Sequence, residues 1–203
     1  MIPHHLVDMT TALGHKINFL NPGYTPIDKE DLYTHTRHIC RYNGAIKWEL
    51  VRHILLCAYL LDCQSMFWTL NADSREIQIA YAISHDFHEV YCSDVVSGMK
   101  KYLPRYQQIE NSWEAYVHQQ LHMPLKYRND KLIRTVDLQA LVVEMTALKH
   151  PGQVIVESKY GVKATIEELC IFDYVSKLSL DKTWEKAWKL FQVGQARIKQ
   201  NGY

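Results

Sequence analysis

The sequence has no surplus of charge of either sign, and this absence narrows the classes of protein to which it can belong. Its 203 residues include 23 Lys and Arg against 22 Asp and Glu, which leaves a formal net charge of +1. Because proteins dedicated to nucleic acid are normally strongly basic, we expect no nucleic-acid polymer as a partner. A local basic pocket for a phosphate is still compatible with this balance.

Long apolar runs and a disulfide framework are also missing. The longest apolar run covers residues 54–61, which is far too short to span a membrane. The N-terminal residues lack the charged and apolar regions of a signal peptide. Five cysteines occur at irregular spacing without a Cys-x-x-Cys motif, which favours a reducing compartment. We therefore expect a cytoplasmic protein without a membrane partner.

Glycine-rich catalytic motifs are absent as well. The eight glycines form neither a Walker-type phosphate loop nor a Gly-x-Ser-x-Gly nucleophile elbow, so P-loop nucleotide hydrolases and α/β-hydrolases are not expected. No repeat, low-complexity segment or linker interrupts the chain, and 47% hydrophobic residues supply a sizeable core. The length fits a single domain over residues 1–203.

Hydrophobic periodicity and helix caps predict an all-α fold. Turn-forming residues predict that the segment 1–27 is irregular. Helices are expected at about 29–41, 46–61, 74–86, 94–102, 107–121, 130–148, 165–176 and 181–198. Residues 154–156 are β-branched and could form a short strand. The C-terminal helices of 152–203 carry an aromatic stripe of Trp184, Trp188 and Phe191, which indicates core or a contact with another subunit.

Two metal-ligating side chains, His85 and Asp86, stand next to each other at the end of an apolar, helix-like run. Neighbours on a helix point about 100° apart, so these two can share an ion only if other segments add ligands at the helix surface. His53 and Asp137 lie on two such segments, each among apolar residues. One ion would give all four side chains the partner that burial demands. Two His and two Asp are typical of a hydrolytic centre, whereas structural zinc sites usually prefer Cys.

Two further carboxylates follow the His-Asp pair. Glu89 lies four residues after His85, on the same helix face, and Asp94 lies about a turn and a half beyond it. Acidic groups beside an ion could activate water or protonate a leaving oxygen. A solvated helix end would explain the same two residues equally well.

The order of these ligands resembles the HD-domain phosphohydrolases. The local pattern is similar to the bacterial 5'-deoxynucleotidase branch and its phage relatives, which include a dATP triphosphohydrolase, and it reads His85-Asp86-x-x-Glu89-x-x-x-x-Asp94. Segments 39–44 and 134–144 also resemble that branch, and the likeness runs from about residue 10 to 150. One departure is Val51-Arg52-His53, where the family has Glu before the first histidine.

The resemblance implies a role for each matching position. A divalent ion (Mn, Co, Zn or Mg) would be bound by four residues, His53, His85, Asp86 and Asp137. Glu89 would hold or activate the attacking water, and Asp94 would assist as acid or base. Phosphate and nucleoside would be contacted by Arg41, Tyr42, Lys100 and Arg134, with Tyr42 in place of a family Trp. A solvated basic pair is the competing interpretation of Lys100 and Lys101. Relatives are oligomeric, so a homo-oligomer is expected.

Three functions remain open at this point. The first is hydrolysis of a deoxynucleotide, with a preference for release of triphosphate from a dNTP such as dATP. Removal of phosphate from a deoxynucleoside 5'-monophosphate is the alternative reaction. The second is a nucleotide-binding regulator that keeps the metal without turnover. The third is a helical scaffold around a structural ion.

Overall fold

The computed structural model describes residues 8–202, with all side chains in that range except those of Asn43 and Ser97. Helices dominate this range, and its named strands form a single two-residue pair, so the predicted all-α class is confirmed. The chain divides into two compact units. Unit 1 contains residues 8–50 and 85–125, and unit 2 contains residues 51–84 and 126–202. Each unit combines two separate stretches of chain, and the single domain 1–203 stays a prediction.

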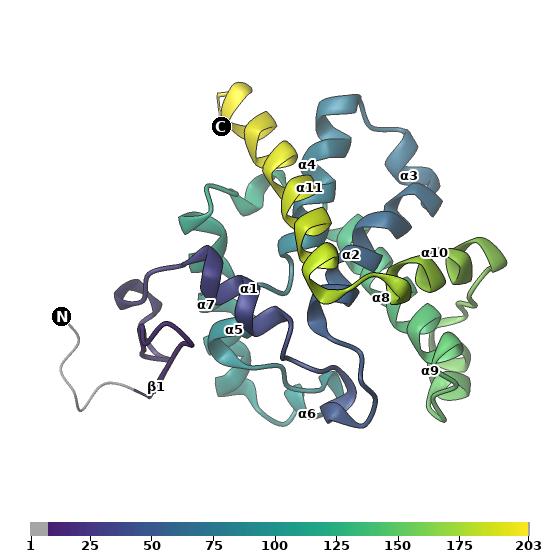
Figure 1. Ribbon diagram of the computed structural model, residues 1–203, viewed down its shortest axis with the longest axis horizontal. Coiled ribbons are helices and arrows are strands. Elements are labelled where there is room, and N and C mark those ends of the chain that lie inside the picture. Colours follow the sequence, from purple (N-terminus) through teal and green to yellow (C-terminus); the bar gives the residue numbers. More distant parts are fainter. Residues whose placement is uncertain (1–7, 203) are drawn as a thin grey trace. The chain divides into compact units, whose positions relative to one another are not determined.

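Unit 1 opens with a small hairpin. Its elements are β1 (Met9–Thr10), β2 (Lys16–Ile17), η2 (Pro22–Tyr24), α1 (Lys29–Thr36), η3 (Tyr42–Gly44), α5 (Glu89–Cys92), α6 (Ser97–Lys100) and α7 (Pro104–Gln120) (Figure 1). The strands pair antiparallel with Met9 opposite Ile17, and Gly14 turns the chain with a φ of 81°. The prediction of an irregular segment is therefore wrong for the two strands of this hairpin. Residues 1–7 lie outside the described range.

The first long helix begins where the sequence predicts but ends earlier. Asp28 caps α1, and its side chain accepts a 2.7 Å hydrogen bond from the amide two residues on. The sequence predicts a helix to residue 41, whereas α1 ends at Thr36. Residues 37–49 instead form a loop that an isolated antiparallel bridge closes between Cys40 and Glu49. This loop carries Arg41 of the predicted site.

An aromatic stack fixes α5 against α7 in unit 1. The rings of Tyr91 and Trp113 lie 5.2 Å apart and nearly parallel, and both side chains are fully buried. Their polar atoms are satisfied at the rim, since the Trp113 indole donates to the Phe19 carbonyl at 3.2 Å and the Tyr91 hydroxyl accepts from the Asp28 amide at 3.4 Å. The stack thereby holds the short helix that begins at Glu89.

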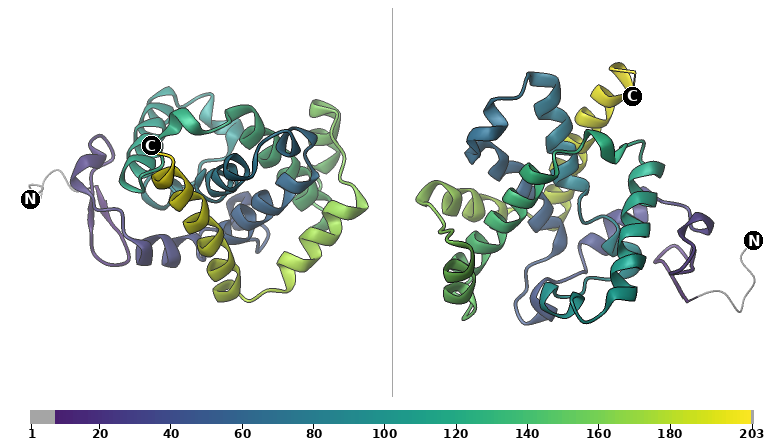
Figure 2. Two further views of the ribbon diagram at one scale, coloured as in Figure 1. Left: turned by 90° about the horizontal axis from the view of Figure 1, so that it is seen from above. Right: turned by 180° about the vertical axis from the view of Figure 1, so that it is seen from behind.

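Unit 2 is built around long helices. Its elements are α2 (Leu50–Leu60, from the last residue of unit 1), η4 (Leu61–Cys63), α3 (Ser65–Trp68), α4 (Ala72–Ser84), η5 (Leu125–Tyr127, also shared), α8 (Asp130–Ala147), α9 (Gln153–Tyr160), α10 (Ile166–Lys177) and α11 (Leu180–Gln200). α11 lies along α4 (Figure 1, Figure 2). Trp184 and Phe191 are buried and Trp188 is half-buried, so most of the aromatic stripe of α11 packs in the core of unit 2.

Several local predictions for these helices are wrong. Residues 154–156 are part of α9 and not a strand, and Val154 and Ile155 are 72% and 70% exposed, so no packing would hold a strand there. In unit 1, the helix expected at 94–102 is the shorter α6, Ser97–Lys100, and the helix expected from residue 107 begins earlier, because Pro104 occupies the first position of α7. Within the described part of the chain, none of the helices has the length and apolar character that crossing a bilayer requires.

Candidate metal centre

His53 is the most enclosed of the predicted ligands. It lies on α2, and its side chain is completely buried. α8 places a carboxylate at each ring nitrogen: Glu144 Oε1 lies 2.7 Å from Nδ1, and Asp137 Oδ1 lies 3.2 Å from Nε2. Glu144 is also completely buried, whereas the Asp137 side chain is 47% exposed. The buried ring therefore has a fully buried carboxylate at Nδ1 and a half-exposed carboxylate at Nε2.

These two carboxylates restrict how the imidazole can be protonated. The short contact with Glu144 calls for a proton on Nδ1, because an ionised carboxylate only accepts hydrogen bonds. A neutral ring then turns the lone pair of Nε2 toward the negative oxygen of Asp137, which is repulsive. Either a second proton on the imidazole or a cation between Nε2 and Asp137 removes this repulsion. A carboxylate behind the far nitrogen is the usual environment of a metal-bound histidine.

The dimensions of the gap suit a metal ion. Bonds of about 2.0–2.2 Å place two nitrogen or oxygen ligands about 3.0–3.4 Å apart around one ion, and the separation of His53 Nε2 and Asp137 Oδ1 is 3.2 Å. Cys57 lies one turn further along α2, with Sγ 3.5 Å from Nε2. The candidate ligand atoms of these three side chains all lie within 4.8 Å of one another. Burial raises the pKa of the Cys57 thiol to about 11.

In unit 1, His85 and Asp86 lie in a turn directly after Ser84, the last residue of α4. Because the backbone is no longer helical, the neighbouring side chains can face each other, and His85 Nε2 lies 3.2 Å from Asp86 Oδ2. This pair thus has the same separation as the pair in unit 2 and suits a shared ion equally well. The guanidinium of Arg41 lies 3.7 Å from Asp86.

Arg41 and Tyr42 occupy the loop after α1. The Arg41 amide donates to the Trp48 carbonyl at 3.0 Å, and its guanidinium carbon lies 5.9 Å from the centre of the Tyr42 ring. Tyr42 has a φ of 58°, in the left-handed region that non-glycine residues rarely adopt. Backbone strain of this kind costs about 1–3 kcal/mol and concentrates at functional sites. The strain supports a role for this loop without defining the ligand.

Glu89 and Asp94 share a cavity of unit 1. Glu89 is 5% exposed, and within the described residues its Oε2 has no hydrogen-bond partner. Burial, followed by the charges of Asp86 and Asp94, raises the pKa of the Glu89 carboxyl well above its usual value. The cavity measures about 290 Å³ and is lined by Met9, His35, Ile39, Cys40, Glu89, Val90, Ser93 and Asp94. Both predicted catalytic carboxylates therefore face one space.

Lys100 is not a solvated surface lysine. It ends α6 and pairs with the carboxylate of Glu110 on α7, which also lies 3.6 Å from His88 Nε2. Burial would lower the pKa of Lys100, but the hydrogen bond and charge of Glu110, aided by Glu89, outweigh it and raise that pKa. Burial likewise opposes ionisation of Glu110, but His88 and Lys100 together lower its pKa. Lys100 is thus held as a cation in unit 1, whereas Lys101 is exposed.

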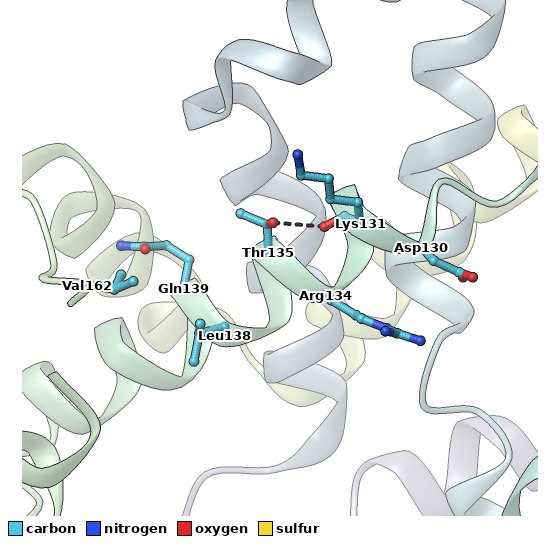
Figure 3. Close-up of a pocket in the computed structure, with 7 residues that line it drawn as sticks. All are labelled: Asp130, Lys131, Arg134, Thr135, Leu138, Gln139 and Val162. Atoms are coloured by element: carbon cyan, nitrogen blue, oxygen red, sulfur yellow. Dashed lines mark hydrogen bonds between the residues drawn. The ribbon is translucent and has the colours of Figure 1, made fainter. Parts of the chain in front are cut away.

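Arg134 lies on the exposed face of α8, three residues before Asp137. It lines a pocket of about 630 Å³ together with Asp130, Lys131, Thr135, Leu138, Gln139 and Val162 (Figure 3). The Thr135 hydroxyl donates to the Lys131 carbonyl at 2.8 Å within the same helix. The two cations give this pocket of unit 2 a capacity for anions.

Arg52, the residue before His53, has hydrogen-bond partners on another helix of unit 2. The Arg52 guanidinium donates to the carbonyls of Val175 and Ser176 at 2.8 and 3.0 Å. These carbonyls belong to the last turn of α10, where the helix dipole favours a positive charge. Arg52 therefore joins α2 to the end of α10. Its positive charge serves this contact and cannot replace the glutamate that the resembling family has at this position.

The structure brings the predicted residues together in two groups. Within unit 1, Asp86 contacts both His85 and Arg41 and raises the pKa of Glu89, and within unit 2 Asp137 contacts His53. Sequence reasoning missed three residues of these groups, Cys57, Glu110 and Glu144. Glu144 lies two helical turns after Asp137 inside an apolar run, and Cys57 lies one turn after His53, so helical spacing could have found both.

Comparison with known proteins adds one distant relative. No family model matches the chain. The chain is 25% identical over 108 residues to a protein of Escherichia coli (strain K12) described as "Uncharacterized protein YfdR". The match covers 50% of this chain, which spans about half (53%) of the length of that relative. The description of this relative names no activity, so the function is inferred from the site.

Proposed function

We propose that the chain is a metal-dependent phosphohydrolase of deoxynucleotides. The observation that carries the proposal is the buried imidazole of His53 held between two carboxylates, with Glu144 on Nδ1 and Asp137 on Nε2. A buried ring in this setting needs a positive charge, and a divalent ion at Nε2 supplies it. The candidate ions are Mn, Co, Zn and Mg.

We propose that His53, Asp137, His85 and Asp86 bind one ion together, as the resemblance to the HD-domain phosphohydrolases implies. The ligand atoms of His53 and Asp137 lie 3.2 Å apart, and so do those of His85 and Asp86, which is a separation that suits a shared ion. Four ligands leave positions open on an ion that takes five or six.

The remaining residues act on the substrate. When bound, a divalent ion lowers the pKa of water and polarises a phosphoryl oxygen. Glu89, whose buried Oε2 has no hydrogen-bond partner in residues 8–202, holds the attacking water and accepts its proton. Asp94 faces the same cavity and donates a proton to the leaving oxygen. Arg41 and Lys100 offset the negative charge of the phosphate as the bond breaks.

The number of phosphates depends on which cations are available. Arg41 faces Asp86 and Lys100 faces Glu110, so the cations of unit 1 are already balanced by carboxylates. This balance suits the smaller charge of a monophosphate and keeps the 5'-deoxynucleotidase reaction as the alternative. Lys131 and Arg134 add positive charge on the helix that carries Asp137, which favours a triphosphate. We retain triphosphate release from a dNTP, such as dATP, as the first reaction.

The proposal is tested by incubating the metal-free protein with each candidate ion and a panel of dNTPs, dNMPs and ribonucleotides. Release of triphosphate supports the first reaction, and release of phosphate from monophosphates supports the alternative. Glu89→Gln is the matched control and should lose turnover while keeping the fold. Absence of hydrolysis with every ion and nucleotide would contradict an enzymatic function. Nucleotide binding without turnover would support the alternative function, a nucleotide-binding regulator that keeps the metal.

Two other expectations stay predictions. The homo-oligomer rests on the resemblance, because two of the three aromatic residues that suggested a subunit contact, Trp184 and Phe191, are buried in the core of unit 2. A cytoplasmic location, in a host cell if the chain is phage-encoded, also stays a prediction. Sedimentation of the purified protein would measure the oligomeric state directly.

A further inference from the structure

Cys57 lies in the candidate metal centre but is not part of the proposed ligand set. It is fully buried on α2, four residues after His53, so both side chains project from the same helix face. Its Sγ lies 3.5 Å from His53 Nε2 and 4.0 Å from Nδ1. The thiol therefore faces the ring nitrogen that also faces Asp137, and not the nitrogen that Glu144 occupies.

These separations match those of ligands on one ion. Around one ion with bonds of about 2.3 Å to sulfur and about 2.05 Å to nitrogen, the two ligand atoms lie about 3.1 Å apart at an octahedral angle and about 3.5 Å apart at a tetrahedral angle. The Sγ–Nε2 distance in unit 2 is 3.5 Å. Sulfur, nitrogen and the Asp137 oxygen all fall within 4.8 Å of one another. Three atoms of ligand type, from three side chains, therefore lie close enough together to bind a single ion.

We propose that Cys57 is a direct ligand of the ion and that it makes the centre selective for Zn²⁺ or Co²⁺ over Mg²⁺ and Mn²⁺. The inference rests on the proposed function for the existence of the ion. Thiolates bind borderline and soft ions, whereas Mg²⁺ and Mn²⁺ favour oxygen ligands. On binding, the thiol releases one proton to solvent and the sulfur donates an electron pair to the ion.

Ligation by Cys57 is compatible with turnover. The four predicted ligands and one thiolate leave the sixth position of an octahedral ion open for water or a phosphate oxygen. Catalytic zinc sites with cysteine ligands are known as a class, provided that one position stays open. A site closed by Cys57 and three other ligands would instead correspond to the structural-ion scaffold, and the hydrolysis assay separates the two.

The test is the absorption spectrum of the metal-free protein titrated with Co²⁺. Ligation by Cys57 gives a thiolate-to-cobalt charge-transfer band in the near ultraviolet with the first equivalent, beside the weak visible bands of the bound ion. Cys57→Ser and Cys57→Ala should lose the charge-transfer band and keep the visible bands. Cys63→Ser, a half-buried cysteine of the same unit outside the cluster, is the control and should keep both.

Each outcome decides a different claim. Visible bands without a charge-transfer band in the unsubstituted protein would overturn ligation by Cys57 and leave the ion itself in place. Absence of any cobalt band would overturn the ion and the proposed function with it. If the Cys57 variants fail to fold, a missing charge-transfer band in the unsubstituted protein still overturns the claim, and a band that is lost in Cys63→Ser overturns it as well. In folded variants, Zn²⁺ affinity should fall at least about tenfold and Mn²⁺ affinity by much less.

Discussion

Replacing Glu144 by glutamine changes one charge behind His53 and keeps the shape of the side chain. In the native protein Glu144 Oε1 lies 2.7 Å from His53 Nδ1, and both side chains are completely buried. A hydrogen bond to a charged group contributes about 1.5–3 kcal/mol, against about 1 kcal/mol for a neutral one. The amide of glutamine can still accept from Nδ1, so the variant loses about 1–2 kcal/mol of ligand orientation.

That loss converts to metal affinity. At about 1.4 kcal/mol per factor of ten, Glu144→Gln should weaken binding of the ion by about 5- to 30-fold. This agrees with the about 10- to 100-fold usually lost when a carboxylate behind a metal-bound histidine is removed. Competition with a chromophoric chelator for Zn²⁺ measures the change directly.

The matched control is another buried glutamate of unit 2. Glu168 is 4% exposed, closes the capping box of α10 with Thr165 and accepts from Gln139 at 2.8 Å, away from the ring of His53. Glu168→Gln should lower the free energy of unfolding without changing metal affinity. A folded Glu144→Gln protein with affinity within about twofold of the native value would refute the role assigned to Glu144.

Three further predictions concern stability and are measured by urea unfolding. In the metal-free protein, the raised pKa of Glu89 stabilises the fold at low pH, and this effect is lost as the pH rises through that pKa. Glu89→Gln should therefore exceed the native stability by about 1–3 kcal/mol near pH 8 and by little near pH 4, and a difference that does not grow with pH would contradict the raised pKa. Arg52→Ala should cost about 1–3 kcal/mol, because two carbonyls at the end of α10 lose a charged donor, and an unchanged midpoint would remove that role. Gly194→Ala would place a Cβ 2.3 Å from the Glu76 carbonyl oxygen and should cost about 1–3 kcal/mol. Gly98→Ala, with nothing within 4 Å, is its control and should be neutral or stabilising.

The long helices could be predicted because their sequences agree at several levels. The segment expected at 130–148 is α8, Asp130–Ala147, with apolar periodicity along one face and the side chain of Asn129 as a cap at its start. The start of α4 is misplaced by a few residues for a local reason: Asn71, and not Ser74, accepts the capping hydrogen bond, at 2.8 Å from the Ser74 amide. Both residues favour N-caps, so composition alone does not choose between them.

α9 shows where such reasoning fails. Its residues 154–156 are β-branched, which favours a strand in isolation. Val154 and Ile155 are largely exposed in the helix. Their apolar side chains therefore do not follow the spacing of a buried helix face, which is the signal that predicts a helix. Whether these residues form a helix or a strand depends on contacts with neighbouring segments, which cannot be predicted from the local sequence.

Some residues of the candidate site could also be predicted from the sequence, whereas others could not. His53, His85, Asp86 and Asp137 could be picked out because ionisable side chains inside apolar runs need partners. The contact of Glu144 with His53 joins residues that helical spacing alone does not pair. The sequence left a phosphate contact and a solvated surface position both open for Lys100, because its partner Glu110 lies on another helix. Sequence patterns therefore identified candidate ligands better than the residues that orient them.

The central proposal is that His53, His85, Asp86 and Asp137 bind the same ion, and metal analysis of single variants tests it most directly. Metal-free protein is loaded with Zn²⁺, dialysed and assayed for zinc per chain, beside His53→Ala from unit 2 and His85→Ala from unit 1. The account predicts one equivalent in the native protein and loss of that same equivalent in each folded variant. Full retention of zinc by either variant would contradict a shared ion.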